Sequence, residues 1–223
     1  MAHRMARAGA AVDIDTGGGE VLATLMTVPP LLVATESWPP NVARARRNLR
    51  SLPAAVLATG ADGELPLASA RFDLVVSRHP VTTSFAEIAR VLRPGGTYLS
   101  QQVGPGSVRE LTDFLMGPKP PSTRRHPERV AEAASAAGLE VVDLRTATLR
   151  MEFFDIAAVV HFLRKVIWIV PGFTVERYRT RLGDLHRHIE AVGAFVAHAE
   201  RFLIEARRPD EAGRERPGAK GAT

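Results

Sequence analysis

The residues with the clearest chemical potential lie near the start of the chain, where an acidic apolar run meets three glycines. The segment AAVDIDTGGGEVLATL places Asp13 and Asp15 just before Gly17, Gly18 and Gly19. Glycines at a turn between a strand and a helix allow positive φ angles and let a ligand approach the backbone closely. The amides that open a following helix favour electron-rich or anionic groups. The pattern therefore predicts a ligand held against this loop, although glycines also occur in turns that are merely tight.

A further carboxylate, Glu36, ends the next apolar run, about twenty residues after the glycines. A carboxylate at this place can accept hydrogen bonds from both hydroxyls of a ribose. The alternatives are that Glu36 caps the following helix or faces solvent. A dinucleotide-binding fold would show the same two features, but this loop reads D-x-G-G-G from Asp15 and lacks the G-x-G-x-x-G spacing. Asp13 inside the strand, where a buried carboxylate needs hydrogen-bonding partners, also argues against that fold.

Alternating strands and helices must position these residues. Apolar runs and helical periodicities alternate along the chain, which predicts an α/β fold with a doubly wound, mostly parallel sheet covered by helices on both faces. The seven expected strands are Ala10–Asp15, Leu31–Thr35, Ala54–Ala58, Arg71–Ser77, Thr97–Val103, Glu140–Thr146 and 197–208. The expected helices between them are Glu20–Met26, 37–52, Thr83–Leu92 and His126–Ala137.

Two helix starts carry capping signals. Ser37 precedes two prolines in the first turn of the helix 37–52 and is expected to cap it. Ser84 and Glu87 stand in capping-box spacing at the start of the helix Thr83–Leu92.

The pattern changes after the sixth strand. Two amphipathic helices, broken at Pro171-Gly172, are expected between about 150 and 192, as a helical cap inserted before the last strand. The cap belongs to one domain of residues 1–208, and the tail 209–223, rich in Gly, Pro and charge, is expected to be disordered. We expect the segment 150–175 to fold over the cleft and line an acceptor pocket; alternatively, its aromatic residues only pack the cap onto the sheet. These residues are Phe153, Phe154, Phe162, Trp168 and Phe173.

Composition excludes several classes of function. The chain of 223 residues has no cysteine, so disulfides, a thiol nucleophile and cysteine-ligated zinc are excluded, which suits a cytoplasmic protein. No apolar run is long enough to span a bilayer, and the N-terminus lacks a signal-peptide core. The net charge of +5 permits nucleic acid as a partner, but no aromatic-rich basic stripe accompanies it, so nucleic-acid binding is not expected.

Several motifs in register resemble a known family. Asp13 to Gly19 looks like the D-x-G-x-G-x-G loop of class I S-adenosylmethionine-dependent methyltransferases, which are Rossmann-like enzymes. ELPLASARFDLVVSRH resembles the segment that leads into their fourth strand, and EIARVLRPGGTYLSQQV resembles their fourth helix, Pro-Gly-Gly turn and fifth strand. The match runs from about Ala10 to Val103, with weaker agreement to Arg207. It is similar to the type 11 group of that family.

The resemblance assigns roles to the first loop and the second strand. The loop at Asp13, Thr16, Gly17 and Gly19 would hold the methionine part of S-adenosylmethionine. Glu36 would bind the ribose hydroxyls of that cofactor.

The later motifs carry the remaining cofactor contacts. Asp62, one position later than the usual acid of the family, would flank the adenine together with Gly63. Ser77 and Arg78 would line the cofactor near its reactive centre. The family's first loop glycine is Asp15 here; aspartate tolerates the left-handed backbone, and its carboxylate would face the ammonium or sulfonium of the cofactor. Little sequence precedes the first strand, where family members carry a covering helix.

Methyl transfer requires few catalytic side chains, because the methyl carbon of a sulfonium is already activated. His79, directly after the fourth strand, is the candidate general base; the alternatives are a loop histidine bonded to backbone or one that orients the substrate. His161, His186 and His188 are expected to be surface residues, and no metal site is expected.

The predicted function is methyl transfer from S-adenosylmethionine to a small-molecule acceptor, and the aromatic cap segment favours an apolar one. Two alternatives stay open: an RNA or protein methyltransferase, for which the arginines of helix 37–52 would serve, and a non-catalytic protein that binds S-adenosylmethionine. The sequence does not determine the oligomeric state.

Overall fold

The computed structural model describes residues 1–60, 62–120 and 125–210. The chain divides into two compact units, which are described separately. The first unit comprises Met1–Gln102, Val130–Arg145 and the chain from Leu203, and the second comprises Val103–Arg129 and Thr146–Phe202. None of the described helices is long and apolar enough to cross a membrane.

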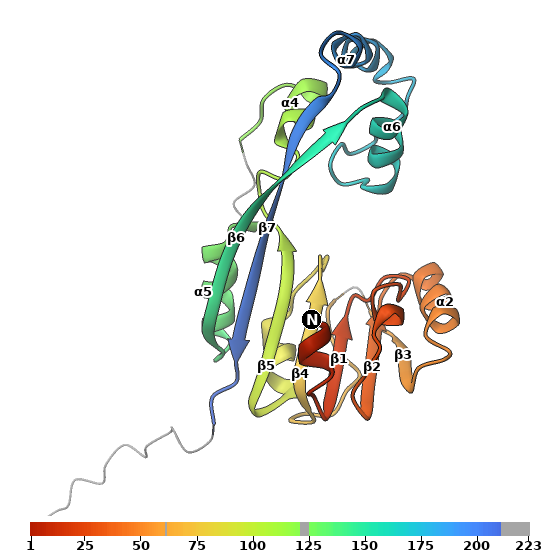
Figure 1. Cartoon of the computed structure of the whole chain (residues 1–223). Coiled ribbons are helices and arrows are strands. Elements are labelled where there is room, and N and C mark those ends of the chain that lie inside the picture. The colour runs from red at the N-terminus through yellow and green to blue at the C-terminus, as the bar shows by residue number, and fades with distance from the viewer. Residues whose placement is uncertain (61, 121–124, 211–223) are drawn as a thin grey trace, which may run out of the picture. The chain divides into compact units, whose positions relative to one another are not determined.

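A seven-stranded sheet organises the fold, as predicted, and its strand order is β3-β2-β1-β4-β5-β7-β6 (Figure 1). Neighbouring strands from β3 to β5 run parallel. Strand β7 runs opposite to β5, because backbone hydrogen bonds pair Gly95 with Arg208 and Gly104 with Glu200. The strands are β1 Ala10–Ile14, β2 Leu31–Glu36, β3 Ala54–Ala58, β4 Phe72–Arg78, β5 Leu92–Val103, β6 Glu140–Phe153 and β7 Phe195–Arg207.

The central strands form because their apolar runs are buried on both faces of the sheet. Val12 and Val75 are fully buried and lie opposite each other in register between β1 and β4. The order in which strands are added to the sheet reverses between β1 and β4. From β1 the chain continues to β2 and β3 on one side, and from β4 it continues to β5 on the other. Ligands of open parallel sheets bind beyond the carboxyl ends of the strands at such a reversal.

The expected helix Glu20–Met26 is wrong. Only a 3-10 turn, η1 Leu22–Thr24, follows the glycines. β-branched residues lose side-chain freedom in a helix, and residues 20–28 contain four of them, at Val21, Thr24, Thr27 and Val28, before Pro29 ends any helix that could form. The fully buried Leu22 fixes the turn against the core of the first unit.

The other expected helices are present with shorter bounds: α2 Pro39–Asn48, α3 Phe85–Val91 and α5 Pro127–Ala136. A short helix, α1 Ala2–Met5, precedes β1. The capping role of Ser84 is confirmed, because its Oγ accepts a hydrogen bond from the Glu87 amide. The capping role of Ser37 is wrong: Trp38 occupies the cap position, and no side chain of that residue caps the helix.

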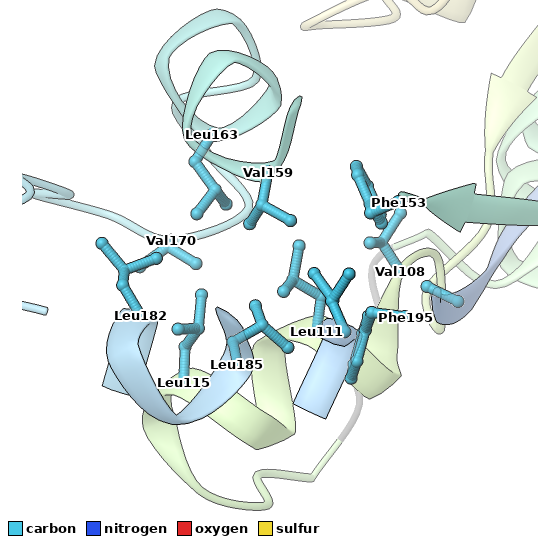
Figure 2. Packing of buried hydrophobic residues seen from close by; sticks show 12 residues of the cluster. Val108, Leu111, Leu115, Phe153, Val159, Leu163, Val170, Leu182, Leu185 and Phe195 are labelled. Carbon is cyan, nitrogen blue, oxygen red and sulfur yellow. The ribbon is translucent and has the colours of Figure 1, made fainter. Parts of the chain in front are cut away.

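The second unit has a core of its own, formed by α4 Arg109–Met116, α6 Ile156–Lys165 and α7 Arg179–Val192. Figure 2 shows Leu111, Val159 and Leu185 from these three helices converging on one apolar centre. The expected cap at about 150–192 lies inside this unit, which also takes up residues 103–129 and the helix α4 that sequence analysis did not anticipate. Most of the expected disordered tail, from residue 211, lies outside the described residues.

Candidate cofactor site

A cleft lies at the carboxyl ends of β1 to β4 in the first unit. It holds about 660 Å³ not filled by protein atoms, part of it open to solvent. Its walls come from the strand ends and from two loops, and they include Ile14, Asp15, Thr35, Ser37, Gly63, Ser77, Val81 and Tyr98.

Asp15 adopts the left-handed backbone that its place in the glycine motif requires, with φ 54°. Aspartate tolerates this conformation better than most residues, so the departure from glycine is accommodated, as predicted. Its Oδ2 accepts a hydrogen bond of 3.0 Å from the amide of Val81. The carboxylate therefore lines the cleft and ties the first loop to the loop after β4.

The three glycines shape the first loop for different reasons. Gly17 and Gly19 have φ angles of 65° and 77°, which favour glycine. A Cβ on Gly19 would lie 3.0 Å from the Cγ of Leu49, so this glycine lets the loop pack against α2. The carbonyl of Gly18 accepts a hydrogen bond of 2.8 Å from the side-chain amide of Asn48. Because no α-helix follows, the expected anion-binding helix start is missing from this loop.

Asp13 is a buried carboxyl on β1, 4% exposed. Burial raises its pKa to about 7; the nearby Thr16 hydroxyl lowers the pKa, and the charges of Asp15 and Glu36 raise it further. Three carboxyl groups therefore share one region at the head of the cleft. Their mutual repulsion would be relieved by a ligand that carries positive charge.

Glu36, at the end of β2, is 6% exposed. Its Oε1 accepts hydrogen bonds from the amides of Ser37, at 3.0 Å, and Trp38, at 2.9 Å. Its Oε2 accepts only a long bond of 3.4 Å from the side-chain amide of Asn41. Glu36 thus fixes the two residues that precede α2 without capping the helix itself, while its second oxygen keeps capacity for further donors.

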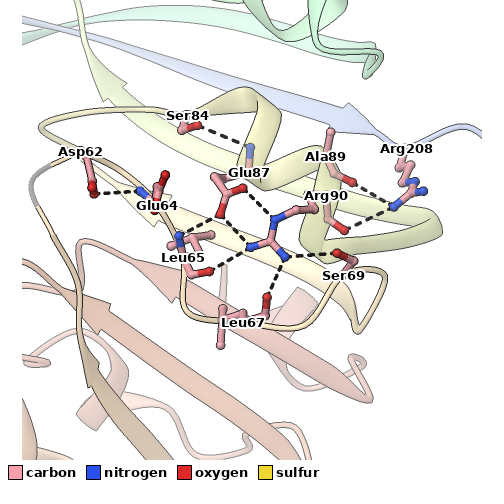
Figure 3. Close-up of polar contacts among 10 residues, drawn as sticks. All are labelled: Asp62, Glu64, Leu65, Leu67, Ser69, Ser84, Glu87, Ala89, Arg90 and Arg208. Carbon is pink, nitrogen blue, oxygen red and sulfur yellow. Dashed lines mark hydrogen bonds and ion pairs between the residues drawn. The ribbon is translucent and has the colours of Figure 1, made fainter.

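The expected adenine loop is anchored by an ion pair on α3 (Figure 3). The guanidinium of Arg90 donates to both carboxylate oxygens of Glu87 at 2.7 Å and to the carbonyls of Leu65 and Leu67 at 2.9 and 2.7 Å. Glu87 also accepts from the Leu65 amide at 2.8 Å. The bond from Arg90 lowers the pKa of Glu87 to about 2. This anchoring fixes the loop whose Gly63, Glu64 and Leu65 line the cleft.

Asp62 caps its own turn. Its Oδ1 accepts a hydrogen bond of 3.2 Å from the amide of Glu64. Within the described residues, Gly63 lines the cleft and Asp62 does not, so the predicted adenine contact of Asp62 stays a prediction.

The end of β4 separates the three residues expected there. Ser77 is buried, lines the cleft, and shares hydrogen bonds with the hydroxyls of Tyr98, at 3.0 Å, and Ser100, at 2.8 Å. Arg78 is exposed and donates to the side chain of Gln101 at 3.2 Å. His79 is half-buried with φ 55°, and its amide donates to the Gln101 carbonyl at 2.7 Å. Of the three, only Ser77 belongs to the described lining of the cleft.

Asp13, Thr16, Gly17, Gly19 and Glu36 also lie outside the described lining, although Ile14, Thr35 and Ser37 beside them line it. They remain predicted contacts.

Sequence reasoning missed the polar contribution of two other segments. Thr59 and Gly60 follow β3, and Thr82 to Ser84 precede α3; all of them line the cleft. The available signal was their position, since each segment follows a parallel strand or opens the next helix. Tyr98 had no such signal, because it lies within β5; in the structure it lines the cleft and its hydroxyl shares a hydrogen bond with Ser77.

The aromatic residues expected near the acceptor all belong to the second unit. Phe153 is buried and contacts the ring of Phe162 edge-on, while Phe173 stacks on Tyr178. These residues pack the second unit itself. Phe154 and Trp168 are instead exposed, at 66% and 51%.

Comparisons with known proteins agree with this geometry. Residues 12–100 match a family model described as a methyltransferase domain. Comparison with curated proteins gives no significant match.

Several solved structures share the fold. A Bacillus halodurans protein provisionally assigned as a methyltransferase is 17% identical, with a TM-score of 0.64 over 93% of this chain and 97% of its own. The YcgJ protein of Bacillus subtilis is 14% identical, with a TM-score of 0.65 over 94% and 97%. A Galdieria sulphuraria protein provisionally assigned as a sarcosine dimethylglycine methyltransferase is 17% identical, with a TM-score of 0.54 over 94% and 82%.

The motif loop, the strand order and the matched family model agree with one another. The cofactor of enzymes with this domain is S-adenosylmethionine. Residues 12–100, which contain β1 and its glycine loop, thus match a methyltransferase domain, and the chain has the Rossmann-like fold of class I S-adenosylmethionine-dependent methyltransferases.

Proposed function

We propose that this methyltransferase acts on a small-molecule acceptor and binds its cofactor in the cleft at the ends of β1 to β4. The observation that carries the proposal is the charge of that cleft. Asp15 lines the cleft. The pKa of the buried Asp13 is raised chiefly by burial and also by the nearby charges of Asp15 and Glu36. Such a site favours a sulfonium or an ammonium over a phosphate.

The element that follows the glycine loop distinguishes the site from a dinucleotide site. A pyrophosphate needs the amides of a helix start, and the glycine loop here leads only into the 3-10 turn Leu22–Thr24. The residues present therefore fit the cationic methionine end of S-adenosylmethionine. When bound, this cofactor supplies an activated methyl group, which an acceptor lone pair attacks while the carbon–sulfur bond breaks and the sulfur becomes a neutral thioether.

The chain's own residues bind and orient in this proposal. Glu36 accepts hydrogen bonds from the ribose hydroxyls through Oε2, because Oε1 already accepts from two backbone amides. Asp15 holds the positive end of the ligand and, through the Val81 amide, keeps the loop after β4 in place. Ser77 holds the hydroxyl of Tyr98 in place in the cleft by a hydrogen bond. The Tyr98 phenol stays protonated because burial raises its pKa.

Local partners of the arginines on α2 support a small acceptor over nucleic acid. Arg44 lies 3.7 Å from Glu20, and Arg46 donates to the carbonyl of Val56. These two arginines therefore have partners close to their own helix.

Calorimetric titration with S-adenosylmethionine tests the cofactor site. We expect saturable binding that Glu36→Gln weakens by about tenfold or more, since a charge-assisted hydrogen bond contributes about 1.5–3 kcal/mol. Glutamine retains the acceptor for the Ser37 and Trp38 amides, so α2 keeps its start. The control is Glu20→Gln, which removes an exposed carboxylate from the same loop region and should leave the affinity unchanged within about twofold. Equal binding by wild type and Glu36→Gln would refute the assignment.

Turnover tests the acceptor class. Release of S-adenosylhomocysteine should be stimulated by a pool of small organic molecules and not by RNA or unfolded protein. Stimulation by RNA alone, with a steep salt dependence, would replace this proposal with the nucleic-acid alternative. The absence of turnover with all three pools would favour a non-catalytic binding protein.

A further inference from the structure

A second cavity lies wholly within the second unit. It holds about 1120 Å³ not filled by protein atoms, part of it open to solvent. Its walls come from the residues that follow β5, from one face of α4, from the chain on either side of residues 121–124, and from the loop after α6. Because every lining residue belongs to the same unit, the cavity is a property of that unit alone.

Helix α4 divides its side chains between the core and this cavity. Figure 2 shows Leu111 and Leu115 directed into the apolar centre, where both are buried. The residues that line the cavity recur at intervals of three and four, which places them on one face of a helix. They are Arg109, Thr112, Asp113 and Met116.

The charge of the cavity is positive. Arg109 is held in place by Asp113, at 3.1 Å, and by the carbonyl of Lys119, at 3.0 Å. Lys119 and Arg125 also line the cavity, and no carboxylate among the described residues pairs with either of them. Three cations against one carboxylate favour an anionic ligand.

The opposite wall is apolar. Trp168 is 51% exposed although its neighbour Val170 is buried in the core, which fixes the loop that carries it. Ile169 lines the cavity beside Trp168, and Met116 faces it from α4. A half-exposed tryptophan in a concave site offers a flat apolar surface that a ligand can cover.

We propose that this cavity binds a small organic acid, with its carboxylate near Lys119 and Arg125 and its apolar body against Trp168 and Met116. Cationic and apolar walls facing each other across one cavity select a ligand that has both a charged and an apolar end.

The two tryptophans of the chain, one in each unit, make this binding measurable. In a Trp38→Phe background, the fluorescence of Trp168 alone reports on the cavity. The probes are 3-phenylpropanoate and its neutral amide, which share a body and differ in charge. We expect a saturable change in Trp168 emission with the acid, and about tenfold weaker binding of the amide.

Paired variants test the cationic wall. Lys119→Gln combined with Arg125→Gln should weaken binding of the acid by about tenfold and leave binding of the amide unchanged. The control combines Arg164→Gln with Lys165→Gln, which makes the same charge change on α6 outside the cavity and should leave both affinities unchanged. The proposal is overturned if Trp168 does not respond, if acid and amide bind equally, or if the control pair weakens the acid as much as the cavity pair.

The failure of this inference can be told from the failure of the proposed function. S-adenosylmethionine is titrated calorimetrically into the same Trp38→Phe protein. Cofactor binding without a Trp168 response to the acid overturns the cavity and leaves the cleft assignment intact. A Trp168 response without cofactor binding overturns the cofactor site and leaves the organic-acid cavity standing.

Discussion

The cleft of the first unit and the core of the second unit are built from opposite kinds of residue. At the cleft, buried carboxyl and hydroxyl groups lie beside a left-handed aspartate. In the second unit, buried apolar side chains from three helices fill one centre. Desolvated charge and backbone strain oppose folding, whereas apolar burial favours it. The contrast indicates that the cleft residues of the first unit lower its stability and serve binding. The apolar core of the second unit stabilises that unit and holds its surface residues in place.

The largest expected effect lies in the second unit. Leu185→Ala should lower the free energy of unfolding by about 3–5 kcal/mol, because it leaves a void in a fully buried cluster. The affinity for S-adenosylmethionine, measured below the unfolding transition, should stay within about twofold. Loss of cofactor binding by the folded variant would show that the core of the second unit also shapes the cleft.

The next effect is a pH dependence from Asp13. Its folded pKa of about 7 lies above the ordinary value of 3.8, so the folded state binds more protons than the unfolded state between these pH values. Its contribution to stability is therefore greatest at low pH and declines as pH rises towards the folded pKa. We expect a loss of about 2 kcal/mol between about pH 5 and pH 7.

Asp13→Asn should remove that decline, because asparagine does not titrate. Chemical denaturation at several pH values measures the difference between the two proteins. Parallel stability profiles for wild type and variant would mean that the carboxyl is not desolvated as described.

Two glycines, one in each unit, should respond to alanine with opposite sign. Gly19→Ala should destabilise the protein by about 1–2 kcal/mol, since φ is 77° and the new Cβ would lie 3.0 Å from Leu49. Gly183→Ala, inside α7 with 3.7 Å to its nearest neighbour, should stabilise it by about 0.5–1 kcal/mol. Thermal unfolding of both variants tests the pair, and effects of equal sign would contradict the assigned backbone geometry.

The smallest expected effect concerns Glu87, whose pKa is lowered to about 2, chiefly by its hydrogen bond from Arg90. A lowered folded pKa gives stability that is present above the ordinary value of 4.5 and is lost as pH falls through about 2. Glu87→Gln should therefore cost up to about 1 kcal/mol at neutral pH, after allowance for solvent screening, and nothing at about pH 2. The exposed Glu176→Gln should cost less at neutral pH, and an equal cost would show that the Arg90 pair contributes no stability.

The strands were predictable because their signal is local. Ala54–Ala58 was predicted with the bounds that β3 has. Strands β1 and β2 differ from expectation by one residue at one end, and β4 by one residue at each end. Buried parallel strands read as short apolar runs, and the sequence contains them in order. The need for a left-handed residue at position 15 could likewise be seen in the motif, and Asp15 has that conformation.

The helix after the glycines and helix α4 were not predictable in this way. Residues 20–28 carry an apolar pattern, but β-branched residues and the following proline leave only η1. Residues 109–116 are too few for a clear periodicity, and the cap position before their helix is held by Val108, a β-branched residue with φ 60°. A hydrogen bond of 2.6 Å from the Val108 amide to the carbonyl of His198, distant in sequence, accompanies this conformation.

The sequence by itself determined the succession of strands along the chain and the acidic glycine loop, because each depends on residue types a few positions apart. Its resemblance to a known family indicated the class of cofactor. Tertiary structure alone decided which donors each carboxylate oxygen of Glu36 accepts from, Ser37 at Oε1 and Asn41 at Oε2. It also decided that the pKa of Asp13 is raised. It also decided that one face of α4 meets Trp168 across a cavity. These properties depend on which groups exclude water from one another, and that depends on contacts between segments far apart in the chain.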